Sequence, residues 1–95
     1  MRYVDLTWSR EASRRMDERD VDEEVVLIVI ERGEIVEEIH RPGRELSTRV
    51  YLDHVDGRPI HVVVGHDGAA ARGHVVTTYE PTLDRWEPGF RERRR

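Results

Sequence analysis

The fold of this protein is decided by residues 48–65, which read TRVYLDHVDGRPIHVVVG. Two runs rich in β-branched and aromatic residues, at 48–55 and 58–65, stand on either side of the dipeptide Asp56-Gly57. These two residue types tolerate the positive φ angles that a two-residue hairpin turn requires at its central positions. The stretch therefore predicts two antiparallel strands joined by a tight turn.

Two further strands are predicted on either side of this hairpin. Residues 34–40 mix apolar and charged side chains and end at the sequence RPGR, residues 41–44, which is typical of a turn. Residues 73–79 form the last predicted strand, after a loop of small residues at 66–72. Pro81 ends that strand, because proline cannot donate a hydrogen bond to a neighbouring strand. Connections this short favour an antiparallel sheet.

Two helices are predicted before the sheet. Ser9 is a suitable N-cap for a first helix at residues 10–19, where good helix formers dominate. Asp20, with Glu23 three residues later, has the spacing of a capping box. That box would open a second helix over roughly residues 21–32.

The second helical segment carries conflicting signals. Residues 25–30 read VVLIVI, and a run of β-branched residues favours a strand. The acidic first turn favours a helix, and so does Gly33, which suits the C′ position at a helix end. We predict a helix. Because it is apolar on nearly all sides, we expect it to be largely buried.

These segments predict an α+β fold in which two N-terminal helices pack on one face of a four-stranded, largely antiparallel sheet. Residues 1–8 form either a short N-terminal strand or an extended arm. Strand alternation places His61 on the face opposite Val62, and it places Tyr79 on the same face as Val75. The face away from the helices is half polar, which suits a substrate surface.

Length and composition limit the classes of protein that this chain can form. A chain of 95 residues makes one domain, and the absence of cysteine excludes disulfides, thiolate catalysis and cysteine-ligated zinc. No apolar run approaches the roughly 20 residues of a membrane span, and no apolar region of the signal-peptide type follows Met1. We therefore expect a cytoplasmic protein with no membrane partner.

Charge is distributed unevenly along the chain. All 16 basic residues are arginine, and against 20 acidic residues they give a net charge of −4. Residues 17–38 hold ten of the acids and only two of the arginines. The acidic balance argues against indiscriminate nucleic-acid binding, but it leaves room for a local site lined with arginine.

Three stretches resemble motifs of a known family. Residues 11–21 read EASRRMDERDV and resemble its helix motif His-Ala-x-x-Arg-Met-x-x-Arg-x-Ile, with Glu11 in place of the histidine. Residues 57–64, GRPIHVVV, resemble its Gly-Arg-Pro-Leu-His strand, and residues 75–81 with Trp86 resemble its closing Thr-x-Tyr-x-Pro…Trp strand. The chain thus resembles domain of unknown function 4258, a family grouped with RelE-, ParE- and BrnT-like toxins of bacterial toxin–antitoxin pairs.

The resemblance implies a single RelE-like α+β domain, which we place at residues 1–90, followed by a basic C-terminal tail at residues 91–95. It also supports the helical interpretation of residues 21–32. The tail could contact RNA or an acidic partner, although a frayed terminus is the simpler expectation.

Five residues are candidates for a catalytic site. Arg15 and Arg19 lie one helical turn apart and could clamp a phosphate group; the alternative is ion pairing with neighbouring acids. His61 could donate or accept a proton near neutral pH, and the alternative is a histidine satisfied at the sheet surface. Tyr79 could donate a hydrogen bond to a phosphate or a base, or simply pack. If the family's histidine is an acid or base, Glu11 would have to replace it.

The leading hypothesis is a toxin-like endoribonuclease that needs no metal and no cofactor. In RNA cleavage the neighbouring 2′-hydroxyl attacks phosphorus, so the protein supplies only an acid, a base and cations. Its partners would be RNA and an antitoxin protein. One alternative is a non-catalytic protein-interaction module on the same fold. Another is a protein that binds a metal or a small molecule through its histidines, with His61, His66, Asp67 and His74 as candidates.

Overall fold

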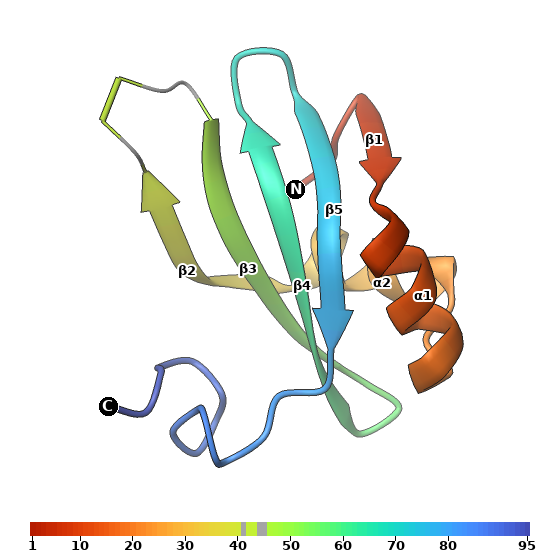
Figure 1. Cartoon of the computed structure of the whole chain (residues 1–95), viewed down its shortest axis with the longest axis vertical. Helices are drawn as coiled ribbons and strands as arrows, with labels where there is room; N and C mark the ends of the chain where they lie inside the picture. The colour runs from red at the N-terminus through yellow and green to blue at the C-terminus, as the bar shows by residue number, and fades with distance from the viewer. Residues whose placement is uncertain (41, 44–45) are drawn as a thin grey trace.

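The computed structural model describes residues 1–40, 42–43 and 46–95, and Figure 1 shows one sheet flanked by two helices. The elements are β1 (Asp5–Trp8), α1 (Arg10–Arg19), α2 (Glu23–Arg32), β2 (Glu34–His40), β3 (Leu46–Val55), β4 (Arg58–Asp67) and β5 (Arg72–Tyr79). The strands lie in the spatial order β1-β5-β4-β3-β2. Neighbouring strands are antiparallel except β1, which runs parallel to β5.

The α+β class and the two helices ahead of the sheet are confirmed. The sheet has five strands rather than four, because the alternative of a short strand within residues 1–8 is the correct one. The fifth strand is β1, which pairs with the first half of β5. Asp56 and Gly57 have φ angles of 52° and 78°, as their hairpin turn requires. Two positions of the predicted turn at 41–44, residues 41 and 44, lie outside the described residues. In the described part of the chain, no helix is long and apolar enough to cross a membrane.

The two helices are separated by a short break at Asp20. Ser9 caps α1 as predicted, because its hydroxyl accepts from the backbone N–H of Ala12 at 2.9 Å. The capping-box spacing predicts that Asp20 begins α2. Asp20 instead ends α1, because its φ of 54° places it in the left-handed conformation. The N-cap of α2 is Asp22, whose carboxylate accepts from the N–H of Val25 at 3.0 Å. The capping box fails because a left-handed aspartate cannot also serve as an extended N-cap.

Gly33 ends α2, but for a different reason than the one predicted. Its φ of −70° is open to any residue, so the position does not require left-handed backbone. A Cβ atom at Gly33 would instead lie 2.3 Å from the carbonyl oxygen of Val29 and 2.7 Å from that of Leu52. Glycine is therefore needed because α2 and β3 approach each other closely at this point.

We expect Gly33→Ala to lower the free energy of unfolding by about 1–3 kcal/mol, because the added methyl group meets backbone atoms that cannot rotate away. Urea denaturation would measure the change. Gly65→Ala is the matched control, because a Cβ there would meet its nearest neighbours at 3.8 Å, which is ordinary contact. Equal stability changes for the two variants would contradict the close approach.

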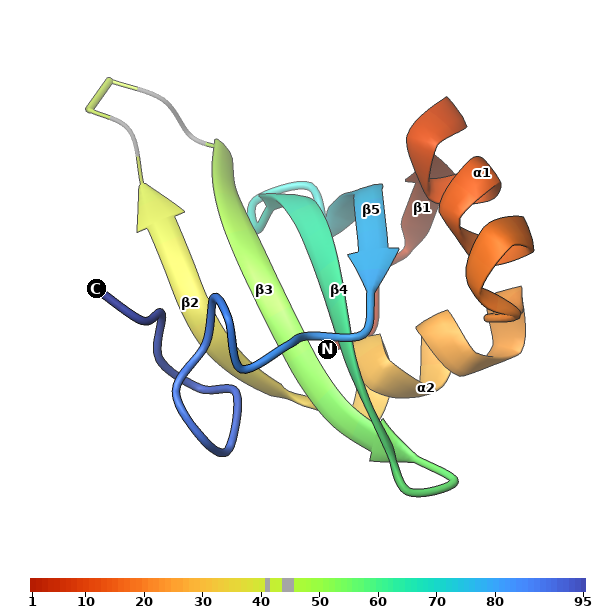
Figure 2. The ribbon, with the colours of Figure 1, turned by 60° about the horizontal axis from the view of Figure 1, so that its bottom comes forward.

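The hydrophobic core lies between the helices and one face of the sheet. α2 packs on β3 and β4, and α1 packs beside β5 beyond the end of β1 (Figure 2). The predicted burial of residues 25–30 holds for one face of α2 only. Val26 and Val29 are fully buried there, whereas Leu27 is 44% exposed on the opposite side. The core as a whole consists of Ala12, Val21, Val26, Val29, Ile30, Tyr51, Ile60, Val62, Val64 and Val75.

A β-bulge in β5 reverses the faces predicted for its second half. Val64 pairs with Val75, but Val63 pairs with Thr77, so Val76 is an extra residue. Partners in register point to the same face, so Thr77 lies on the face opposite Val75.

The same bulge moves Tyr79. Simple alternation puts it with Val75 on the core face, whereas the register pairs it with His61 on the outer face. The predicted face of Tyr79 is therefore wrong. The bulge brings its side chain to the face away from α2.

The C-terminal segment, residues 80–95, crosses this outer face and ends near β2 (Figure 2). Trp86 is only 2% exposed, and two ion pairs attach the segment to β2. They join Arg91 to Glu34 and Arg93 to Glu37, each with a shortest distance of 2.7 Å. The segment is thus attached to the sheet by Trp86 and by these ion pairs, although residues 91–95 themselves are exposed.

Candidate functional site

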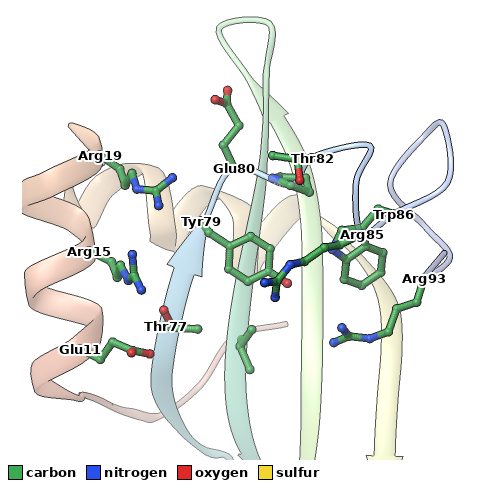
Figure 3. Close-up of a pocket in the computed structure, with 12 residues that line it drawn as sticks. Glu11, Arg15, Arg19, Thr77, Tyr79, Glu80, Thr82, Arg85, Trp86 and Arg93 are labelled. Carbon is green, nitrogen blue, oxygen red and sulfur yellow. The ribbon is translucent and has the colours of Figure 1, made fainter. Parts of the chain in front are cut away.

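A hollow of about 510 Å³ lies between α1, the end of β5 and the C-terminal segment (Figure 3). It is lined by Glu11, Arg15, Arg19, Val63, Thr77, Tyr79, Glu80, Pro81, Thr82, Arg85, Trp86 and Arg93. Four of these side chains are arginines and two are glutamates. The hollow therefore carries a positive balance in a chain whose net charge is −4.

The first wall of the hollow is formed by α1. Glu11, Arg15 and Arg19 follow one another at four-residue spacing, so all three lie on one face of the helix. Ser9 fixes the start of α1 against the bulge, because its hydroxyl donates to the carbonyl oxygen of Val76 at 2.6 Å. The helix face that carries these residues is therefore held beside β5.

The side chains of this wall are weakly engaged within the protein. The closest ion-pair contacts are 3.7 Å from Arg15 to Glu18 and 3.8 Å from Arg14 to Glu11. Contacts of this length at the surface contribute little free energy. Among the residues that the structure describes, the Arg19 side chain makes no ion pair. Arg15 and Arg19 are thus available to a bound anion.

The second wall is formed by the C-terminal segment, which supplies Arg85 and Arg93. Figure 3 shows these two side chains reaching toward the space above Tyr79 from the side opposite α1. The Arg93 guanidinium donates two hydrogen bonds to Glu37, at 2.7 and 3.1 Å, and lies 4.7 Å from the centre of the Trp86 ring. Its position is therefore fixed from two sides.

Sequence reasoning missed Arg85 and Arg93 as site residues. The signal that could have found them is Trp86, because a tryptophan in an otherwise polar segment is seldom left in solvent. A buried tryptophan requires its neighbours to pack on the protein as well.

Tyr79 and Thr77 form the floor of the hollow, and His61 lies beneath them. The Tyr79 hydroxyl is 3.2 Å from Nδ1 of His61, and Nε2 of His61 donates to the carbonyl oxygen of Phe90 at 2.9 Å. His61 is fully buried and also packs edge-on against Trp86, with ring centres 4.4 Å apart. The structure therefore joins His61 to Tyr79 but not to the hollow itself.

Burial governs the ionisation of this pair. It lowers the pKa of His61, which the hydrogen bond to the Phe90 carbonyl opposes only in part. Burial likewise raises the pKa of Tyr79. Both side chains are therefore neutral at physiological pH.

The remaining candidate histidines do not gather with His61. His74 pairs with Gly65 in the sheet, and its Nδ1 lies 2.7 Å from the Thr7 hydroxyl. His66 lies on the core face, on the other side of the sheet from His61. Within residues 1–40, 42–43 and 46–95, no three histidine or carboxylate side chains are grouped in a way that could hold a metal ion.

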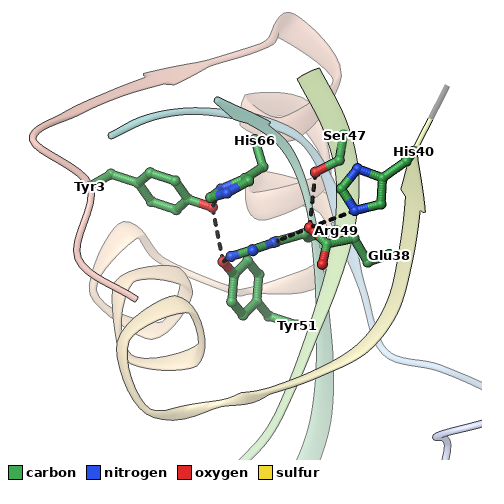
Figure 4. A network of polar contacts seen from close by, with 7 residues as sticks. All are labelled: Tyr3, Glu38, His40, Ser47, Arg49, Tyr51 and His66. Atoms are coloured by element: carbon green, nitrogen blue, oxygen red, sulfur yellow. Dashed lines mark hydrogen bonds and ion pairs between the residues drawn. The ribbon is translucent and has the colours of Figure 1, made fainter. Parts of the chain in front are cut away.

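His66 belongs to a separate polar network on the helix side of β3 (Figure 4). Its Nδ1 lies 2.8 Å from the hydroxyl of Tyr3, which lies 2.9 Å from the hydroxyl of Tyr51. Burial and the Tyr51 hydroxyl raise the pKa of Tyr3. Arg49 connects Tyr51 to the carboxylate of Glu38. These polar groups bond to one another, so the network stabilises the part of the sheet that the helices leave uncovered.

Four of the five predicted site residues thus line one hollow: Glu11, Arg15, Arg19 and Tyr79. The fifth, His61, is not among the residues that line it. The arrangement offers guanidinium groups that bind phosphate, two carboxylates that can move a proton, Glu11 and Glu80, and one phenol hydroxyl.

The match to known families covers most of the chain. Residues 8–80 match the family described as "Domain of unknown function (DUF4258)". Comparisons with curated proteins and with solved structures give no significant match. The matched region holds α1 and β5 with Glu11, Arg15, Arg19 and Tyr79, and it ends before Arg85 and Arg93. The chain is therefore a member of the DUF4258 family.

Proposed function

We propose that this protein is a metal-independent endoribonuclease and the toxin-like component of a bacterial toxin–antitoxin pair, with a RelE-like fold. The observation that supports this most is the pair of facing arginine walls. Arg15 and Arg19 stand on one side of the hollow and Arg85 and Arg93 on the other. A nucleic-acid backbone that enters the hollow would meet guanidinium groups on both sides.

The chemistry of RNA cleavage fits the groups present. The ribose 2′-hydroxyl attacks the adjacent phosphorus, so the protein needs no nucleophile of its own. The arginines would stabilise the negative charge that develops on the phosphoryl oxygens. Glu11 is the carboxylate open to the hollow from α1, and it would accept the proton of the 2′-hydroxyl. His61 cannot take this part directly, because Tyr79 and Trp86 separate it from the substrate.

Purified protein is expected to cleave single-stranded RNA in the presence of a metal chelator. Arg15→Ala should lower kcat/KM by about 10- to 100-fold, which corresponds to one lost charge-assisted hydrogen bond. Gel analysis of a labelled RNA measures both effects. Arg10→Ala, on the same helix but outside the hollow, should leave the rate nearly unchanged. Absence of cleavage by the unaltered protein would contradict the proposed activity.

A protein-interaction module on the same fold is a second candidate, favoured by the exposed edge of the sheet. β2 is one of the two edge strands of the described sheet, and its residues Ile35 and Ile39 are about half exposed. An open edge strand can pair with a strand of another protein. This function predicts a stable complex with a partner and no RNA cleavage, which the same assay and a pull-down would distinguish.

A further inference from the structure

The hydrogen bonds of His61 determine where its proton lies. Its Nε2 is 2.9 Å from the carbonyl oxygen of Phe90. A carbonyl oxygen can only accept a hydrogen bond, so Nε2 must carry the hydrogen. A neutral imidazole carries one hydrogen, and Nδ1 is therefore a bare acceptor. The C-terminal segment thus selects the tautomer of a histidine in the centre of the sheet.

His61 stays neutral because it has no access to water. It is fully buried between Tyr79 and Trp86, and the charged groups that act on it are Arg93 and Glu37, which form an ion pair with each other. An ion pair presents nearly balanced charge to its neighbours. Desolvation therefore dominates and disfavours the imidazolium form.

The direction of the next hydrogen bond follows from this tautomer. Tyr79 Oη lies 3.2 Å from Nδ1 of His61, and Nδ1 can only accept, so the phenol donates its single hydrogen to His61. No hydrogen is left on Oη to point toward the hollow. Tyr79 therefore presents only oxygen lone pairs to a molecule bound there.

We propose that Tyr79 accepts a hydrogen bond from a ribose 2′-hydroxyl of bound RNA and so distinguishes RNA from DNA, with His61 as the positioning residue. This 2′-hydroxyl belongs to a different nucleotide from the one whose 2′-hydroxyl Glu11 deprotonates, because each hydroxyl has a single hydrogen to give. This inference rests on the proposed binding of RNA. Phosphate oxygens are acceptors only and would pair with the arginines, not with a Tyr79 oxygen that lacks a hydrogen. Along a nucleic-acid backbone, the 2′-hydroxyl is the group that can donate.

The test uses three oligonucleotides of one sequence, with 2′-amino, 2′-fluoro or 2′-deoxy sugars. The 2′-amino sugar retains a donor but lacks the attacking hydroxyl, whereas the other two sugars have no donor. At a pH where the amine is neutral, the unaltered protein should bind the 2′-amino strand about 2- to 10-fold more tightly than the 2′-fluoro strand. Fluorescence anisotropy measures the three dissociation constants.

Two variants separate Tyr79 from the arginines. Tyr79→Phe should abolish the preference for the 2′-amino strand and leave the affinity for the 2′-fluoro strand unchanged. Arg15→Ala should weaken binding of all three strands by the same factor, because their phosphates are identical. A preference that survives in Tyr79→Phe would overturn the proposal.

The tautomer can be observed without any ligand. ¹⁵N NMR of the histidine side chains should show His61 protonated at Nε2 and bare at Nδ1. Protonation at Nδ1 would overturn the argument, because the Tyr79 hydrogen would then be free to face the hollow.

If the 2′-amino preference holds but unmodified RNA is not cleaved, the recognition stands and the nuclease proposal fails. If RNA is cleaved but the 2′-amino preference is absent, the nuclease proposal stands and the recognition by Tyr79 fails. If the protein binds none of the strands, both proposals fail.

Discussion

Replacement of Trp86 by alanine is expected to lower the free energy of unfolding by about 3–5 kcal/mol, the usual effect of truncating a buried tryptophan. The indole is 2% exposed and packs against the ring of His61, and the guanidinium of Arg93 lies over it. Its loss removes a large buried side chain that holds the C-terminal segment on the outer face of the sheet. For a domain of this size, such a loss is a large part of the total stability.

Denaturant unfolding followed by circular dichroism would measure the change. Leu83→Ala is the matched control, because Leu83 lies in the same segment but is 53% exposed, and it should shift stability by less than about 0.5 kcal/mol. In Trp86→Ala the imidazole of His61 should also become accessible to water, so its pKa should rise toward the ordinary value. Similar stabilities for the two variants would show that the segment does not depend on Trp86.

Removal of one arginine from each wall is expected to lower kcat/KM for RNA by roughly 100- to 10,000-fold, from two charge-assisted contacts of about 1.5–3 kcal/mol each. Arg19 and Arg85 suit this test, because within the described residues neither side chain is held in an ion pair. In the double variant Arg19→Ala/Arg85→Ala, the slope of log affinity against log salt should fall by roughly one for each lost contact.

The two single variants show how the walls cooperate. If Arg19 and Arg85 bind different phosphates, their effects on transition-state free energy should add; if they bind the same phosphate, the double variant should lose less than the sum. The double variant Arg32→Ala/Arg72→Ala removes the same charge away from the hollow and should be close to the unaltered protein. Equal losses in the two double variants would exclude the hollow as the place where RNA binds.

Local signals in the sequence predict most of the architecture. The Asp56-Gly57 hairpin and the Ser9 cap are recognisable because turns and caps depend on the conformational preferences of one or two residues. The helical conformation of α2 is also recognisable from the sequence, because its acidic first turn outweighs the strand preference of the β-branched run that follows. Asp20 shows the limit of such signals, because one aspartate can end a helix or begin one and its neighbours decide which.

The site is less accessible to such reasoning because it depends on contacts between distant segments. Arg15 and Arg19 could be identified from their helical spacing. The position of Tyr79 relative to His61 could not, because a single inserted residue at Val76 reverses the faces of the rest of β5. Arg93 joins the site through Glu37, and no local pattern in a chain rich in both charges reveals that pair.

The pairing of β1 with β5 has a consequence for the order of folding. The β3–β4 hairpin joins segments that are adjacent in sequence, so closing it costs little chain entropy. Asp5 pairs with Arg72, which is far away in sequence, so we expect this pairing to cost more chain entropy and to form later. α1 reaches its position along the same edge, so the arginine-lined hollow is assembled late in folding. Fraying of that edge would disrupt the hollow while the central hairpin survives, and a partly folded chain would therefore lose the hollow before it is fully unfolded.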